Sequence, residues 1–81
     1  MVLSIFVEKS HCIVNTKDIG KIIKERRMSL KVNQFELAEL AGVGINTLVA
    51  IERGQGNPKL STLLAIVDTL GLQLDLIMKE E

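Results

Sequence analysis

The stretch QFELAELAGVGINTLVAIERG, residues 34–54, decides the fold predicted for this chain of 81 residues. In its second half Leu48 and Ile51 lie at helical spacing, and Gly42 separates this half from the first. A chain that reverses within about three to four residues needs a residue that tolerates positive φ, as glycine does. The stretch therefore predicts two short helices joined by a sharp turn. The expected inward face of the first helix consists of Phe35, Leu37, Ala38, Leu40 and Ala41.

Particular residues in and around this stretch resemble the helix-turn-helix of the Cro/Xre family of phage and bacterial repressors. They are Gln34, Ala38, Gly42, Val43, Leu48, Ile51 and Glu52-Arg53-Gly54, with Ile19-Gly20, Arg27, Asn57-Pro58 and Leu70-Gly71 on the two sides. The resemblance implies an all-α, lambda-repressor-like domain of four to five helices. We expect this domain over residues 16–71, after an N-terminal extension (1–15) and before a C-terminal dimerisation strand and tail (72–81).

Length and composition agree with one small domain. Apolar residues make up 47% of the chain and aromatic residues only 2%, so the core must be aliphatic. Few aromatic rings also argue against a stacking surface for single-stranded nucleic acid. A domain of this size is near the lower limit of what folds alone, and contacts with a partner subunit would add to its stability.

The overall charge balance hides a gradient along the chain. Ten Lys and Arg residues balance ten Asp and Glu residues. Residues 17–31 hold six basic residues against two acidic ones, whereas residues 60–81 hold four acidic residues against one basic. Screening confines attraction to about a Debye length, so a phosphate backbone responds to the local charge. One end of the domain is therefore expected to face DNA, although lysines such as Lys17, Lys21 and Lys24 fit a solvated helix face equally well.

The sequence carries few signals of the cellular compartment or of metal binding. The single cysteine, Cys12, excludes an intramolecular disulfide and points to a reducing compartment. No segment approaches the ~20 apolar residues of a membrane span, and residues 1–7 lack the basic start of a signal peptide. These features predict a cytoplasmic protein. His11 neighbours Cys12, but adjacent strand residues point to opposite faces and no further Cys or His completes a site, so neither a metal nor a cofactor is expected.

The residues before the first helix are β-branched and aliphatic enough for short strands at 2–7 and 11–14. Another helix is expected before the paired helices, from about Lys17 to Ser29, and it is the first helix of the chain. It would be capped by Asn15 or Thr16 and favoured by Asp18 in its first turn. Its buried stripe would contain Ile19, Ile22, Ile23 and Leu30. The family resemblance implies that Arg27 forms a structural ion pair with Glu52.

Two segments are candidates for contacting the DNA backbone. Asn33 is the expected N-cap of the second helix, and Gln34 stands beside free backbone amides, a position suited to a phosphate oxygen. The resemblance implies the same contact for Gln34. The loop after the second of the paired helices contains two glycines, so its amides can approach a phosphate closely. Its expected contact residues are Arg53, Gln55, Asn57 and Lys59.

The second of the paired helices, which contains Leu48 and Ile51, is the recognition helix of this architecture. Base reading is expected from its early residues, which enter the major groove. Asn46 is the clear hydrogen-bonding candidate, able to reach adenine N6 and N7, and Ile45 can touch a thymine methyl group. Gly44 and Ala50 are also expected at the DNA, but together with Val49 they stand where relatives carry polar side chains. Two hypotheses follow. Either sequence specificity comes largely from DNA shape and dimer spacing, or this face of the helix binds something other than a specific operator.

A fourth helix is predicted from the stripe Leu60, Leu63, Leu64, Val67 and Leu70, and it ends at Gly71. The period then changes to two, which predicts a strand with a dimerisation face of Leu72, Leu74, Leu76 and Met78. Such a strand needs a partner, either the N-terminal strand of the same chain or its copy in a second subunit. This arrangement resembles the HipB-type antitoxins.

The function expected from these features is that of a homodimeric DNA-binding repressor with recognition helices about 34 Å apart on an inverted repeat of double-stranded DNA. The narrower resemblance implies an antitoxin that also holds a HipA-type kinase toxin. A free-standing phage-type or housekeeping repressor and a protein-interaction adaptor without DNA binding are the alternatives. An enzyme is not expected, because no set of nucleophile, base and carboxylate is visible.

Overall fold

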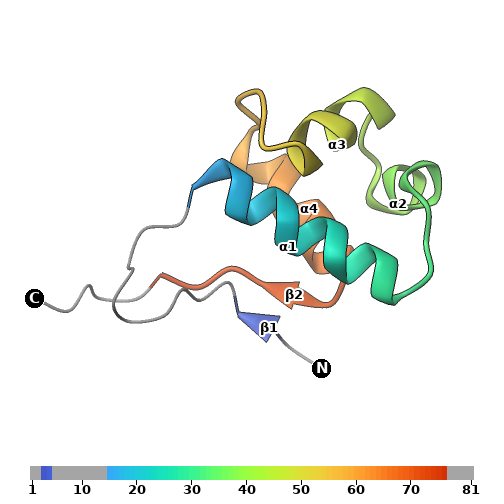
Figure 1. Ribbon diagram of the computed structural model, residues 1–81, viewed down its shortest axis with the longest axis horizontal. Helices are drawn as coiled ribbons and strands as arrows, with labels where there is room; N and C mark the ends of the chain where they lie inside the picture. Colours follow the sequence, from blue (N-terminus) through green and yellow to red (C-terminus); the bar gives the residue numbers. More distant parts are fainter. Residues whose placement is uncertain (1–2, 5–14, 77–81) are drawn as a thin grey trace, which may run out of the picture.

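The computed structural model of the chain describes residues 3–4 and 15–76 (Figure 1). Four helices follow a short N-terminal strand and precede a second one. The elements are β1 (Leu3–Ser4), α1 (Thr16–Ser29), α2 (Gln34–Ala41), α3 (Ile45–Glu52), α4 (Leu60–Thr69) and β2 (Leu72–Gln73). The predicted all-α class is confirmed, with four helices.

Capping residues set the start of the first two helices. Asn15 accepts a hydrogen bond from the Asp18 backbone N–H at 2.9 Å, and Asp18 accepts one in return from the Asn15 N–H. Asn33 and Glu36 form the same reciprocal pair at the start of α2. Such capping boxes satisfy backbone donors that have no partner inside the helix. The sequence therefore fixes where α1 and α2 begin.

The core lies where the four helices meet and is aliphatic, as the composition predicts. Its fully buried side chains are Ile23, Leu37, Leu48 and Ile66, one from each helix. Ala38, Ile51, Val67, Leu70 and Leu72 complete the buried set. The core thus joins α1, α2, α3, α4 and the first residue of β2.

Part of the predicted inward faces was wrong. Leu30, Phe35, Leu40, Leu60 and Leu64 are exposed, although each was assigned to a buried stripe. In α2 the neighbouring helices cover only the side that carries Leu37 and Ala38, and in α4 Ile66 takes the central position. A short helix with apolar residues on several sides does not reveal from its letters which side is covered.

The terminal strands pair with each other within the chain. β1 and β2 are parallel, with Leu3 opposite Leu72 and Ser4 opposite Gln73. Of the strand predicted over 72–78, residues 72–73 form β2, and Leu74 to Leu76 follow without strand structure. Met78 and the strand predicted at 11–14 lie outside the described residues. In Figure 1, α1 lies between this small sheet and α3.

Arg26 connects the first helix to the last one. Its Nε donates a hydrogen bond of 2.8 Å to the carbonyl oxygen of Leu70, the C-cap of α4. A cation is favourable at a helix C-terminus, where carbonyl groups lack helical partners. Arg26 therefore holds α4 against α1.

Among the described residues, no helix combines the length and apolar character needed to span a membrane.

Candidate nucleic-acid interface

The turn between α2 and α3 is formed by a glycine in the left-handed conformation. Gly42 has φ 72°, and the Val43 N–H donates to the Ala38 carbonyl at 3.0 Å. A residue with a Cβ atom is strained at this φ. The turn directs α3 across α2, and Leu48 of α3 is fully buried. The opposite side of α3 is left facing outward.

A second close contact fixes α3 against α1. A Cβ atom added to Gly20 would lie 2.2 Å from the Ile51 carbonyl oxygen and 2.9 Å from that of Glu52. The two helix backbones therefore touch at Gly20. This contact determines how far the end of α3 stands from α1.

A buried ion pair lies at the same crossing. Arg27 donates from Nε to Glu52 Oε2 at 2.7 Å and from its second terminal nitrogen to Oε1 at 3.1 Å. The side chain of Glu52 is only 3% exposed and that of Arg27 11% exposed. Arg27 also donates to the Val32 carbonyl at 2.8 Å. The guanidinium group thus connects α1, the end of α3 and the turn before α2 through a two-pronged carboxylate contact.

Gln34 joins this pair from the first turn of α2. Its side-chain nitrogen donates to Glu52 Oε1 at 3.0 Å, while the residue remains partly exposed. The sequence predicted Gln34 as a phosphate contact but did not predict its bond to Glu52. The two residues are 18 positions apart, and only the crossing of α2 and α3 brings them together.

The early residues of α3 form an exposed surface. Gly44 is the N-cap and, like Ile45, Asn46 and Thr47, it is exposed, whereas Val49 and Ala50 are half-buried. Thr47 was not singled out from the sequence. Its place in the first turn of the expected recognition helix was the signal for it. Of the described side chains on this surface, Asn46 and Thr47 carry hydrogen-bonding groups.

The loop between α3 and α4 lies beside the start of α1. Gly54 and Gly56 have φ of 74° and 80°, and the Thr16 hydroxyl donates to the Gly54 carbonyl at 3.1 Å. The predicted DNA contacts of this loop, Arg53, Gln55, Asn57 and Lys59, are all exposed. In Figure 1, this loop and α3 lie on the same side of α1, away from β1 and β2. The predicted DNA contacts of α3 and the loop therefore share one side of the molecule.

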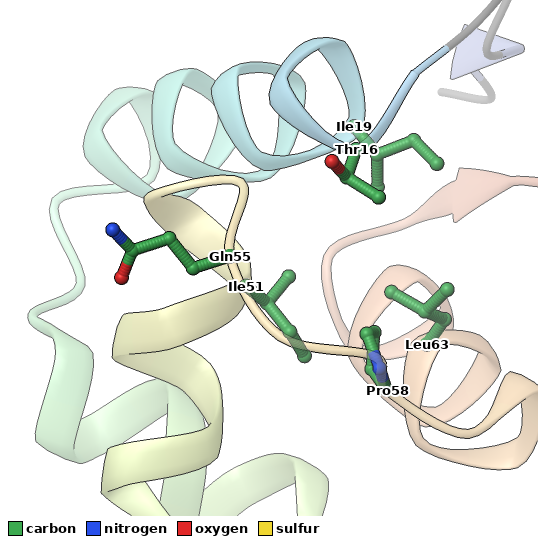
Figure 2. A pocket seen from close by; sticks show the side chains of 6 residues that line it. All are labelled: Thr16, Ile19, Ile51, Gln55, Pro58 and Leu63. Atoms are coloured by element: carbon green, nitrogen blue, oxygen red, sulfur yellow. The ribbon is translucent and has the colours of Figure 1, made fainter.

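A small hollow lies behind the loop, between α1, α3 and α4. It is lined by Thr16, Ile19, Ile51, Gln55, Pro58 and Leu63 and measures about 20 Å³. Figure 2 shows the amide of Gln55 directed away from the apolar lining. A water molecule needs roughly 10–15 Å³ measured in this way, so the hollow is too small for an effector molecule. Within residues 3–4 and 15–76, no three His, Cys, Asp or Glu side chains form a group that could hold a metal ion.

Comparison with known proteins agrees with this geometry. Residues 23–77 match the protein-family model described as helix-turn-helix. The chain is 43% identical to the immunity repressor protein of Bacillus phage phi105 over 78% of its own length and 44% of the phage protein. It therefore spans less than half of that relative.

Two bacterial proteins are also similar. An uncharacterised HTH-type transcriptional regulator of Sinorhizobium fredii is 33% identical over 79% of the chain and 84% of its own length. One from Haemophilus influenzae is 39% identical over 69% of the chain and 60% of its own length. The family-model match over residues 23–77 contains the paired helices and the loop described above.

Proposed function

The chain belongs to the Cro/Xre-type helix-turn-helix family, and from this premise we propose that it is a transcriptional repressor that binds a palindromic operator as a homodimer. The observation that supports this proposal best is the exposed start of α3, with Asn46 and Thr47, on the helix that leads into the glycine-containing loop. A helix presented in this way fits the major groove, while the loop amides and basic side chains fit the flanking phosphates.

Backbone contacts are assigned to the loop and to the start of α2. Arg53 and Lys59 are exposed cations on the two sides of Gly54 and Gly56. Arg26 and Arg27, in contrast, are engaged inside the protein by Leu70 and Glu52. The loop cations and the exposed lysines of α1 therefore supply the positive charge that faces DNA.

The first prediction concerns these loop cations. Replacing Arg53 and Lys59 together by alanine removes two phosphate contacts per subunit, so the slope of log affinity against log salt should become shallower by about 1.8 per subunit. Fluorescence anisotropy with labelled duplex DNA at several salt concentrations measures this slope. The loss should be equal for specific and scrambled DNA. An unchanged slope would remove the loop from the interface.

The second prediction concerns base reading. Asn46→Ala should lose about 1–3 kcal/mol of discrimination at one base pair of each half-site, because a bidentate contact to adenine is removed. Competition with operators mutated one base pair at a time measures this loss. Binding to scrambled DNA should stay unchanged, which separates Asn46 from the loop cations. If sequence preference survives the substitution intact, direct reading by Asn46 is excluded and DNA shape must supply the specificity.

The dimer is assigned to the side of the molecule that carries the sheet. Of the four predicted interface residues, Leu72 is buried in the core of its own subunit, Leu74 is half-buried and Leu76 is fully exposed. Leu76 is the most exposed of these three residues, and we assign it to the contact with a second subunit. Two-fold symmetry then places the same segment of both chains together.

The third prediction tests this assignment. Leu76→Asp should raise the dissociation constant of the dimer at least tenfold, because one charge per subunit would enter an apolar interface. Sedimentation analysis across a range of concentrations measures this constant. Leu40→Asp is the matched control, since Leu40 is an exposed leucine on α2. Equal effects of both substitutions would contradict an interface at Leu76.

The antitoxin role is the finer version of this proposal. In it, the repressor also holds a HipA-type kinase toxin, and DNA binding regulates expression of the pair. A free-standing phage-type repressor is supported by the identity to the phage immunity repressor. Purification of the tagged protein from its host at moderate salt distinguishes the two roles. A stoichiometric kinase supports the antitoxin, whereas a bare homodimer with DNA supports the free-standing repressor.

A further inference from the structure

Glu52 contacts a residue that the proposed function places at DNA. Its Oε1 accepts one hydrogen bond from Arg27 at 3.1 Å and another from the Gln34 side-chain nitrogen at 3.0 Å. Its Oε2 accepts the third bond, from Arg27 Nε. Glu52 itself is buried, whereas Gln34 is partly exposed. The carboxylate therefore reaches from the interior to the edge of the expected interface.

This contact determines which way the amide of Gln34 points. An ionised carboxylate can only accept hydrogen bonds, so Gln34 must turn its nitrogen toward Glu52. The reversed amide would place one oxygen against another. One N–H of the amide is held by Glu52, and the second N–H remains for another acceptor. Arg27 fixes Glu52 from the opposite side with its two-pronged contact.

Orientation before binding has a measurable consequence. A long side chain that becomes ordered on binding costs roughly 0.5–1.5 kcal/mol. A glutamine that is already held avoids most of this cost. The ion pair would then contribute to DNA affinity as well as to the helix crossing.

We propose that Glu52 is a positioning residue for DNA binding, which holds the amide of Gln34 so that its free N–H meets a backbone phosphate. This inference rests on the proposed function, because the phosphate contact of Gln34 belongs to it. Glu52 touches no DNA in this role and acts through Gln34. Arg27 supports the same role one contact further away.

The expected effect of neutralising Glu52 on DNA affinity has the opposite sign from the effect that charge alone predicts. Glu52 is an anion near the surface assigned to phosphates, so neutralising it should strengthen DNA binding through charge alone. Positioning predicts the opposite. Glu52→Gln should weaken binding by about two- to tenfold per subunit, the range that corresponds to immobilising one side chain.

A double-mutant cycle tests the proposal. DNA affinity is measured by anisotropy for the wild-type protein, Glu52→Gln, Gln34→Ala and the double variant, at a temperature where all are folded. Glu52→Gln should weaken binding in the wild-type background and should not weaken it further when Gln34 is alanine. Gln55 provides the matched control, because it is exposed in the loop and has no described bond to Glu52. With Gln55→Ala, the effect of Glu52→Gln should persist in full.

Two outcomes overturn the proposal. Either Glu52→Gln weakens binding equally with and without Gln34, or it leaves binding unchanged or stronger in the wild-type background. Glu52→Asp serves as a second variant if Glu52→Gln does not fold, because it keeps the charge for Arg27 and withdraws the carboxylate from Gln34. The same cycle and the same outcomes apply to it.

A measurement without DNA separates this proposal from the proposed function. In the free protein, nuclear magnetic resonance should show one side-chain amide proton of Gln34 shifted downfield by its bond to the carboxylate. Glu52→Asp should abolish this shift, and an unshifted proton in the wild type would refute the positioning. A wild-type protein that shows the shift but binds no duplex DNA would instead overturn the proposed function and the DNA-binding role of Glu52 with it.

Discussion

Gly20→Ala is expected to destabilise the domain by more than about 3 kcal/mol, beyond the usual cost of overpacking a core. The added Cβ would lie 2.2 Å from the Ile51 carbonyl oxygen, a distance at which the backbones of α1 and α3 must separate. Helix propensity alone gives the opposite sign, because alanine is favoured over glycine inside a helix by about 1 kcal/mol. Denaturant unfolding followed by circular dichroism measures the loss.

Gly44→Ala is the matched control for this prediction. The nearest atom to its added Cβ would be the Thr47 hydroxyl oxygen at 3.7 Å, an ordinary contact. Its cost should stay below about 1 kcal/mol, the effect of a less favourable N-cap. If Gly20→Ala is as stable as the wild type, the close crossing of α1 and α3 is wrong.

Arg27→Met is expected to destabilise the domain by about 3–5 kcal/mol, because it leaves the buried carboxylate of Glu52 without its charged partner. It also removes the bond to the Val32 carbonyl that anchors the turn before α2. Domains of this kind have a total stability of about 5–15 kcal/mol, so the variant should be close to unfolding. Thermal and denaturant unfolding measure the change.

Two further variants make this prediction specific to the ion pair. Lys24→Met removes an exposed cation from the same helix and should change stability by less than about 0.5 kcal/mol. Adding Glu52→Leu to Arg27→Met should recover most of the loss, because no unpaired charge remains buried. A double variant as unstable as Arg27→Met alone would contradict this account of the pair.

Local signals allowed much of the fold to be predicted. Asn33 begins α2 and Gly42 ends it, as their capping and turn chemistry indicates. The start of α1 followed from Asn15 and Asp18 to within one residue of the observed position. These features depend on neighbours three or four residues away, which the sequence shows directly.

Features that depend on packing were predicted less well. Phe35 and Leu40 have the apolar character of core residues, yet both are exposed because α3 and α4 cover other sides of α2. Of the strand predicted over 72–78, the described residues that pair are Leu72 and Gln73, and their partner is β1 of the same chain. Alternation along one strand reveals its faces but neither its partner nor its length.

In the candidate site too, residues with local sequence signals were predicted and a contact that depends on packing was not. The sequence supplied Gln34, Asn46 and the loop, and the family resemblance supplied Arg27 with Glu52. The bond from Gln34 to Glu52 was not predicted, because it depends on the angle at which α3 crosses α2. Its distance of 3.0 Å is a property of the assembled helices.

The most direct test of the central claim is a titration of the labelled protein with duplex DNA from the region upstream of its own gene, followed residue by residue through backbone amide resonances. DNA binding by the α3 surface predicts shifts at Gln34, Asn46, Thr47 and the loop from Arg53 to Asn57. Gln73 in β2 should remain unchanged, since β2 and α3 lie on opposite sides of α1 in Figure 1. An absence of shifts at α3, or shifts centred on the exposed Leu60 and Leu64 of α4, would contradict the claim.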